Sequence, residues 1–279
     1  MALKRVLVAG ASGVLGTELM RELRGRQVWV RALVRDPSRL GVEADEVFVA
    51  DVTKPETLKG ACARVDAVFT CVGAPLSPKG PRFDLVDDWG NRNLLTEAVS
   101  AKVARFGCAS VFGGLLLGSD EYIRAHESFA AAVRTAKVSP LVVRPTVTFA
   151  SLLTVLERAR SGSVRVVAGG EAQTNPIHEA DAATAIADAL DSDETDLSLG
   201  GPELLTQRQV AEVAFDALGR EPHIRSTPNW LSLLGVRYAR WRGAKANDVA
   251  LHRWLAATTE LKAPAVGTRT LADYFADRA

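Results

Sequence analysis

The glycine-rich turn near the amino end carries the residues best suited to bind an anion. Gly10-Ala11-Ser12-Gly13-Val14-Leu15-Gly16 follows the apolar run 6–9, which predicts a buried strand that turns directly into a helix. Glycines permit the tight turn and let backbone N–H groups approach a phosphate without a Cβ in the way. The amino end of the helix adds partial positive charge. The sequence therefore predicts a site for the pyrophosphate of a dinucleotide, formed by Gly10, Ser12, Gly13, Val14, Leu15 and Gly16.

The residue that ends the second predicted strand bears on which dinucleotide fits. In dinucleotide-binding folds an acid at this place usually accepts from the ribose hydroxyls, and it would repel a 2′-phosphate. This chain has Arg35 there, with Arg39 one helical turn later, and a planar guanidinium suits a phosphate. The pattern favours NADP(H). NAD(H) stays possible, because the adjacent Asp36 offers Arg35 an ordinary ion-pair partner.

Two further strand ends contribute candidate cofactor-binding residues. Asp51 and Val52 follow the third strand, where a carboxylate can accept from the adenine amino group. The competing interpretation is that Asp51 caps the turn before Pro55. Gly73 follows the fourth strand, where it lets the backbone pass close to a ribose or simply makes the turn into Pro75.

These candidates need a scaffold that brings the ends of several strands together. Apolar runs alternate with longer helical patterns, which predicts repeated βαβ units and an α/β fold with a Rossmann-type, doubly wound parallel sheet. Besides the first strand, strands are expected at residues 28–34, 47–50, 67–72, 105–109, 141–143 and 164–167, and helices at 14–24, 55–63, 84–101, 120–136 and 149–161.

The alternation stops after Gly200-Gly201-Pro202, so residues 1–200 are predicted to form the NAD(P)-binding domain and residues 201–279 a small, mostly helical C-terminal substrate lobe. Thr206 and Gln209 have the spacing of a capping box for a helix that stops at Gly219. Residues 229–245 then carry an apolar stripe with basic residues on other faces. An interfacial membrane helix has this pattern, but core or pocket wall is the favoured interpretation.

Composition and charge exclude several classes of partner. The 279 residues include 34 basic and 33 acidic residues, a net charge of +1, so no global field attracts nucleic acid or an anionic membrane. We expect a small-molecule substrate as the partner, and neither nucleic acid nor a membrane. The protein is expected to be a monomer or a homodimer. The three cysteines lie in apolar runs, which predicts reduced thiols. The sequence shows no signal peptide and no apolar run near ~20 residues, so a cytoplasmic protein is expected.

Other chemistries lack their motifs. His126-Glu127 and His178-Glu179 begin like a zinc-binding helix, but neither has the second histidine, so no metal site is predicted. The sequence has neither the Gly-x-Ser-x-Gly elbow of serine hydrolases nor a Walker lysine after the glycine turn.

Several stretches resemble the atypical or extended short-chain dehydrogenase/reductase superfamily, and within it the NmrA-like NAD(P)-binding branch. They are GASGVLG at Gly10, VRDPSRL at Val34, VDDWGNRNLL at Val86, RFGCAS at Arg105 and YIRAHESFAAAVRTAKVSPLVVRPT from Tyr122. The likeness covers most of the chain up to about Gly219. It implies a Rossmann domain with a small substrate lobe, and a catalytic Tyr-x-x-x-Lys pair with an upstream serine.

Carried onto this chain, the resemblance makes Ser110 the family serine and Tyr122 the tyrosine, while His126 holds the lysine position and Asp87 replaces the family asparagine. In this chemistry the phenol passes a proton to or from the substrate oxygen as hydride moves, and near neutrality it needs a neighbouring cation. Lysine is charged at neutral pH, whereas an imidazole is mostly neutral. Spacing of four still puts Tyr122 and His126 on one helix face.

Three functions are open on this basis. The first is an NADP(H)-dependent oxidoreductase acting on a small carbonyl, enone or alcohol, in which Ser110 orients the substrate oxygen, Tyr122 is the acid/base and His126 is a weakened partner. The alternative is a non-catalytic NAD(P)H-binding redox sensor or assembly factor of the NmrA-like kind, which the loss of the lysine would permit. A sugar-nucleotide epimerase-like isomerase is the third, although such relatives normally keep the lysine.

Overall fold

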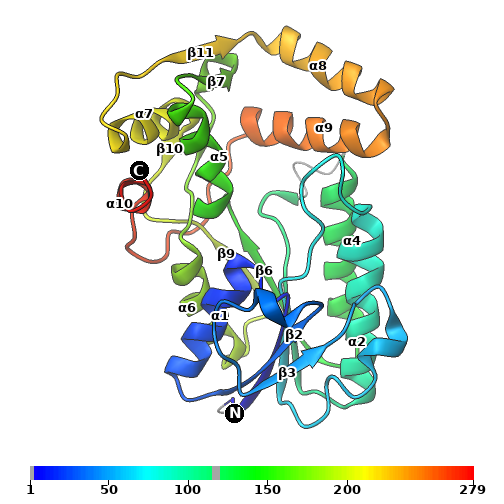
Figure 1. The fold of residues 1–279 in the computed structure, drawn as a ribbon. Helices are drawn as coiled ribbons and strands as arrows, with labels where there is room; N and C mark the ends of the chain where they lie inside the picture. Colours follow the sequence, from blue (N-terminus) through cyan, green and yellow to red (C-terminus); the bar gives the residue numbers. More distant parts are fainter. Residues whose placement is uncertain (1–2, 115–119) are drawn as a thin grey trace.

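A parallel sheet forms the centre of the molecule in the computed structural model, which describes residues 3–114 and 120–279 (Figure 1). Within these residues the sheet has seven strands in the order β3-β2-β1-β4-β5-β6-β9, and every neighbouring pair is parallel. The strands are β1 (Arg5–Ala9), β2 (Trp29–Val34), β3 (Glu46–Val49), β4 (Ala67–Thr70), β5 (Arg105–Ala109), β6 (Ser139–Pro145) and β9 (Asp196–Leu199).

Helices cover both faces of this sheet. The helices α1 (Val14–Gly25) and α6 (Glu179–Leu190) pack on one face, and α2 (Asn91–Ser100) and α4 (Glu121–Thr135) pack on the other (Figure 1). Successive side chains of a strand point to opposite faces, so Val6 and Val8 belong to one core and Leu7 and Ala9 to the other. This arrangement confirms the predicted doubly wound α/β fold.

The edge of the central sheet differs from the prediction. Residues 164–167 do form a strand, β7 (Val164–Val167), but it pairs in parallel with β11 (Ile224–Thr227) in a separate two-stranded sheet. The outer position beside β6 belongs to β9, which the sequence analysis did not predict. This strand has only four residues that alternate between polar and apolar types, so it lacks the continuous apolar run of a buried strand.

One predicted helix is also wrong. Residues 55–63 contain only a short 3-10 turn, η2 (Pro55–Leu58), followed by further turns. Gly60 adopts a φ of +81°, a conformation that a right-handed helix cannot continue through.

The C-terminal lobe draws residues from both sides of Gly200. The helices α5 (Phe149–Arg160), α7 (Gln207–Ala217) and α10 (Leu271–Ala276) share with β7 a hydrophobic core that contains Phe149, Phe215 and Phe275. The predicted capping box is confirmed, because the Thr206 hydroxyl and the Gln209 side chain each bind the other residue's backbone N–H. The division of the chain at residue 200 stays a prediction.

Two antiparallel neighbours complete the lobe, α8 (Asn229–Trp241) and α9 (Ala244–Thr258). In Figure 1, α9 lies between α8 and the central domain, and α8 runs along the outer edge of the lobe. The interpretation of this stretch as core is wrong, because no residue of α8 is buried. Its interpretation as a pocket wall stays a prediction. Among the described residues, none of the helices combines the length and apolar character needed to cross a membrane.

The remaining elements are short. They are η1 (Pro37–Arg39), the π-helix η3 (Asp84–Gly90), η4 (Ala168–Gly170), and the antiparallel pair β8 (Gln173–Thr174) and β10 (Leu205–Thr206).

Candidate functional site

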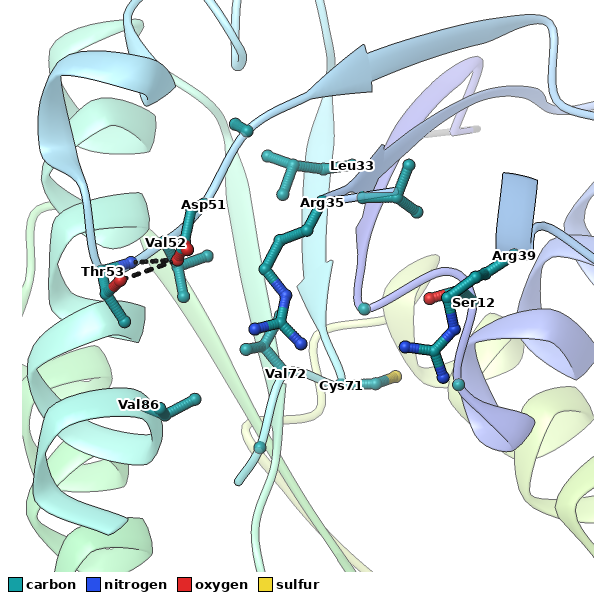
Figure 2. Close-up of a pocket in the computed structure, with 15 residues that line it drawn as sticks. Ser12, Leu33, Arg35, Arg39, Asp51, Val52, Thr53, Cys71, Val72 and Val86 are labelled. Carbon is teal, nitrogen blue, oxygen red and sulfur yellow. Dashed lines mark hydrogen bonds between the residues drawn. The ribbon is translucent and has the colours of Figure 1, made fainter. Parts of the chain in front are cut away.

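A cleft opens where the chain order of the sheet reverses. β1 and β4 are neighbours whose following helices lie on opposite faces, and such a crevice at the carboxyl ends of the strands is where doubly wound folds bind ligands. The cleft has a volume of about 240 Å³ (Figure 2). Its lining consists of Gly10, Ser12, Gly13, Leu33, Val34, Arg35, Arg39, Ala50, Asp51, Val52, Thr53, Cys71, Val72, Gly73 and Val86.

Most of the predicted cofactor-binding residues therefore meet at one place. Gly10, Ser12 and Gly13 come from the turn after β1, Arg39 comes from η1, and the others come from the ends of β2, β3 and β4. The remaining three candidates, Val14, Leu15 and Gly16, form the first turn of α1, just beyond the lining. Sequence reasoning did not single out Leu33, Ala50, Thr53 or Val86, which line the cleft without a motif of their own.

The geometry of the turn requires its glycines. Gly10 has a φ of +75°, and a Cβ there would lie 2.9 Å from the carbonyl carbon of Cys71. A Cβ at Gly16 would lie 2.3 Å from the carbonyl oxygen of Gly10. No side chain caps α1, whose N-cap is Gly13, and its first turn contains no acid. Free N–H groups and the positive end of the helix dipole thus favour an anion at the cleft.

We expect Gly16→Ala to destabilise the protein by roughly 1–3 kcal/mol, because the new methyl group would collide with backbone that has no room to move. Denaturant unfolding followed by circular dichroism measures this change. Gly25→Ala is a matched control at the other end of α1, since a Cβ there meets nothing within 4 Å. Equal stability of both variants would contradict the close approach.

Two guanidinium groups lie at the cleft. Arg35 follows β2 and Arg39 ends η1, and both side chains point into the cleft, Arg39 towards the turn that carries Ser12 (Figure 2). The neighbouring Asp36 is engaged elsewhere: its Oδ1 accepts hydrogen bonds from the backbone N–H of Ser38 at 3.0 Å and from the Ser38 hydroxyl at 2.7 Å. Asp36 therefore binds Ser38 and does not form the ion pair with Arg35 that was considered from the sequence.

Asp51 lines the cleft and also shapes its own turn. Its Oδ1 accepts from the backbone N–H of Thr53 at 2.9 Å and from the Thr53 hydroxyl at 2.8 Å (Figure 2). Burial opposes ionisation of this carboxyl, but the hydrogen bonds from Thr53 and the charges of Arg35 and Lys54 outweigh it and lower the pKa of Asp51. The carboxylate is thus held in its charged form beside Arg35.

Tyr122 and His126 lie together, as their spacing predicted, in an aromatic cluster between Phe83, α4 and α9. The ring centroid of Tyr122 lies 4.6 Å from that of His126, 4.8 Å from that of His252 and 5.1 Å from that of Phe83. Burial, and then the nearby carboxylates Asp87 and Asp120, raise the pKa of the Tyr122 phenol well above its ordinary value. The phenol therefore stays neutral over the whole physiological range.

Each histidine beside Tyr122 faces a fully buried carboxylate. The Nε2 of His126 lies 3.1 Å from Oδ1 of Asp87, and the Nδ1 of His252 lies 3.2 Å from Oδ2 of Asp120. The other oxygens of these acids bind backbone: Asp87 accepts from Ala74 at 3.0 Å, and Asp120 caps α4 by accepting from Ile123 at 2.8 Å. His252 lies 130 residues from Tyr122 in the chain, and no local pattern joins the two, so His252 was not predicted from the sequence.

Ser110 takes a different partner. Its hydroxyl donates to Oε1 of Glu127 at 2.9 Å, and the Glu127 carboxylate in turn pairs with Arg144 of β6, with Oε2 at 3.1 Å from the guanidinium. Glu127 follows His126 in α4, so the two side chains leave the helix in different directions. The structure therefore brings Tyr122 and His126 together and binds the Ser110 hydroxyl to Glu127. Glu127 was considered in the sequence only as part of an incomplete zinc motif.

Asn91 is a further residue that sequence reasoning missed. This buried side chain begins α2 and donates to the carbonyl oxygens of Val72 at 3.0 Å and Asp87 at 3.1 Å. Its own oxygen accepts from the Thr70 hydroxyl at 2.6 Å. Asn91 thus fixes the carboxyl end of β4 against η3, next to the cleft. Asn91 stands among other polar residues of this helix, so no local pattern singled it out.

The cysteines and acids of the described chain offer no metal centre. Cys62, Cys71 and Cys108 are free thiols, and burial raises the pKa of Cys108 to about 12. Within residues 3–114 and 120–279, no three histidine, cysteine, aspartate or glutamate side chains are grouped so that they could ligate a metal ion.

Comparison with known families supports the nucleotide site. A family model described as NAD(P)H-binding matches residues 10–193, from the first glycine of the turn to a point just after α6. The chain belongs to this NAD(P)H-binding family. The matched segment contains all the predicted cofactor-binding residues, and a nucleotide ligand follows from the family. With the fold, it agrees with the NAD(P)-binding Rossmann domain that the resemblance implies.

Individual relatives are more distant. The chain is 32% identical over 246 residues to divinyl chlorophyllide a 8-vinyl-reductase of Zea mays, covering 80% of this chain and 61% of the relative. It is 24% identical over 239 residues to the mitochondrial NADH dehydrogenase [ubiquinone] 1 alpha subcomplex subunit 9 of Arabidopsis thaliana, covering 79% of this chain and 60% of that subunit. The chain thus spans about three fifths of the length of both curated relatives.

The fold has solved neighbours. The structure of NADPH-dependent quinone oxidoreductase from Escherichia coli in complex with NADPH aligns over 98% of this chain and 99% of that one, with a TM-score of 0.71 and 16% sequence identity. At this identity the likeness shows a shared fold.

Proposed function

We propose that this member of the NAD(P)H-binding family is an NADP(H)-dependent oxidoreductase that reduces a small carbonyl or enone. The observation that carries the choice of cofactor is the pair Arg35 and Arg39 at the cleft, where an NAD-specific fold would place an acid. In this proposal residues 1–200 bind the dinucleotide and residues 201–279 form the substrate lobe, to whose core α5 and β7 also contribute. Bound NADPH would supply the hydride for the reduction.

Tyr122 is proposed as the proton donor. Burial and the carboxylates Asp87 and Asp120 keep its phenol protonated, and a neutral phenol can donate to a developing alkoxide or enolate oxygen. Oxidation of an alcohol would instead need a base at this place. A phenol with a raised pKa is rarely ionised, so Tyr122 would be a poor base. The environment of Tyr122 thus favours the reductive direction. Ser110 is proposed to orient the substrate oxygen by exchanging its hydrogen bond to Glu127 for one to the substrate.

The test begins with the purified protein and both coenzymes. Fluorescence titration compares the affinities for NADPH and NADH, and the absorbance of NADPH is then followed across a panel of small aldehydes, ketones, quinones and enones. The proposal expects tighter binding of NADPH than of NADH, and consumption of NADPH with at least one class of acceptor. Preference for NADH would overturn the cofactor assignment.

A second candidate function has a specific observation in its favour. The family lysine is replaced by His126, whose ring faces buried Asp87, and the Ser110 hydroxyl is already bound to Glu127. A protein that binds NADPH only to control a contact with another protein does not need the His126 ring or the Ser110 hydroxyl to be available for catalysis. Tight NADPH binding with no turnover on any acceptor would favour this redox sensor or assembly factor over the reductase.

We expect His126→Lys to retain or raise NADPH-dependent reduction at about pH 8 to 9. An ammonium group beside Tyr122 would bring down the raised pKa of the phenol and stabilise the phenolate left after proton donation. In the wild type the raised pKa keeps the phenol protonated to higher pH, so we expect no loss of activity from ionisation of Tyr122 below about pH 10. Steady-state pH profiles measure both.

His126→Gln is the matched control, because it removes the imidazole without adding a charge. It should not share the gain of the lysine variant. A large loss of activity in His126→Lys, with NADPH affinity intact, would show that the imidazole has a role of its own.

A further inference from the structure

The helix α8 exposes large apolar side chains on the outer edge of the lobe. Trp241 is 90% exposed, Tyr238 66% and Trp230 64%, and Leu231 and Leu234 are exposed as well. A globular protein normally turns such residues towards its core. In Figure 1 this helix lies farthest from the central sheet, with α9 beneath it. An exposed apolar set of this size marks a surface that binds something.

The orientation of α8 is the reverse of that of a helix packed on a core. Its half-buried residues are the small or modest Ser232, Val236 and Ala239, which recur at the helical spacing of one face. The face turned away from the protein carries Trp230, Leu234, Tyr238 and Trp241 at spacings of four, four and three. We call this set, together with Leu231, the outer face of α8. It is apolar, with an aromatic side chain near each end.

The charged side chains in this stretch of the sequence are all of one sign. Residues 222–247 contain no aspartate or glutamate, although the whole chain is nearly neutral. Arg237 and Arg240 flank the outer face and are exposed, and Arg242 follows the helix end. Lys245 turns back towards the central domain, where its ammonium group lies 4.4 Å from the ring centroid of Phe83.

We propose that the outer face of α8 inserts into the headgroup region of an anionic lipid bilayer, as a helix parallel to the membrane surface. A helix that lies at such a surface typically has apolar side chains on one face, aromatic residues at both ends, and flanking arginines with no acids. Arginine side chains beside the stripe can extend to lipid phosphates while their stems stay in apolar surroundings.

The charge favours this occupant over a second copy of the chain. A symmetric contact between two α8 helices would bring Arg237, Arg240 and Arg242 of both copies together without a single acid between residues 222 and 247 to offset them. An anionic bilayer complements the same charge. The expectation of no membrane partner rested on the net charge of +1, which averages this local excess away.

Vesicle cosedimentation tests the proposal with the full chain. We expect binding to vesicles of phosphatidylcholine mixed with phosphatidylglycerol, little binding to pure phosphatidylcholine, and a fall in binding as salt is raised. Binding should also shift the tryptophan emission to shorter wavelength. The double variant Arg237→Glu/Arg240→Glu should lower the partition coefficient at least about tenfold, and Trp230→Ser/Trp241→Ser should do the same.

Matched controls separate the face from general charge and hydrophobicity. Lys59→Glu/Lys137→Glu makes the same change of charge at exposed sites of the central domain, and Trp89→Ser removes another exposed tryptophan, itself 64% exposed. Both should bind vesicles as the wild type does, and NADPH affinity should be unchanged in all variants. Binding that is equal for neutral vesicles, absent, or insensitive to the α8 variants would overturn the proposal. So would a solution dimer that Trp230→Ser/Trp241→Ser converts to monomers without any vesicle binding.

Discussion

Tyr122→Phe is expected to lower turnover about 10²- to 10⁴-fold, the usual contribution of a positioned proton donor, while NADPH affinity stays nearly unchanged. The change removes one oxygen and keeps the ring that packs against Phe83, His126 and His252. It should therefore leave the cluster and the fold intact. An interaction made mainly in the transition state lowers kcat and kcat/KM together.

Steady-state kinetics on whichever carbonyl or enone the wild type reduces, together with NADPH titration, measure this prediction. Tyr274→Phe is a matched control, because burial also raises the pKa of Tyr274, which lies in the lobe core against Phe149. It should keep wild-type turnover. Wild-type activity in Tyr122→Phe would remove this phenol from the mechanism without touching the cofactor assignment.

Arg35→Ala is expected to weaken NADPH binding about 10- to 100-fold more than NADH binding. A charge-assisted, forked contact to a phosphate is worth roughly 1.5–3 kcal/mol, and NADH has no 2′-phosphate to lose. Arg35 follows β2 and points into the cleft, and its neighbour Asp36 is bound to Ser38. Asp36 therefore does not compete with a ligand for the Arg35 side chain.

Titration of both coenzymes into the wild type, Arg35→Ala and Arg39→Ala measures this preference. Arg165→Ala provides the control, since this exposed arginine lies in β7 of the lobe, away from the cleft. It should change neither affinity. Equal weakening of NADPH and NADH by Arg35→Ala would retire the 2′-phosphate assignment.

The sequence by itself determined the nucleotide half of the molecule. The turn from Gly10 to Gly16 and the ends of β2, β3 and β4 could be located from apolar runs and glycines, because these signals act over a few residues. Right-handed connections between parallel strands leave few ways to order such a sheet, and its crevice follows from that order. For this reason the residues predicted from four separate stretches line one cleft.

Only the tertiary structure decided the contacts made across long sequence separations. β7 has the β-branched residues of a strand and was predicted with the others, yet it pairs with β11, because strand propensity does not specify a partner. His252 reaches Tyr122, and Glu127 rather than Tyr122 binds Ser110, through the packing of α9 and α4. The apolar stripe predicted the helix α8 and its two faces. Which face packs against the protein depends on the surface that α9 presents to it. Periodicity records that a face is apolar, and only packing determines what covers it.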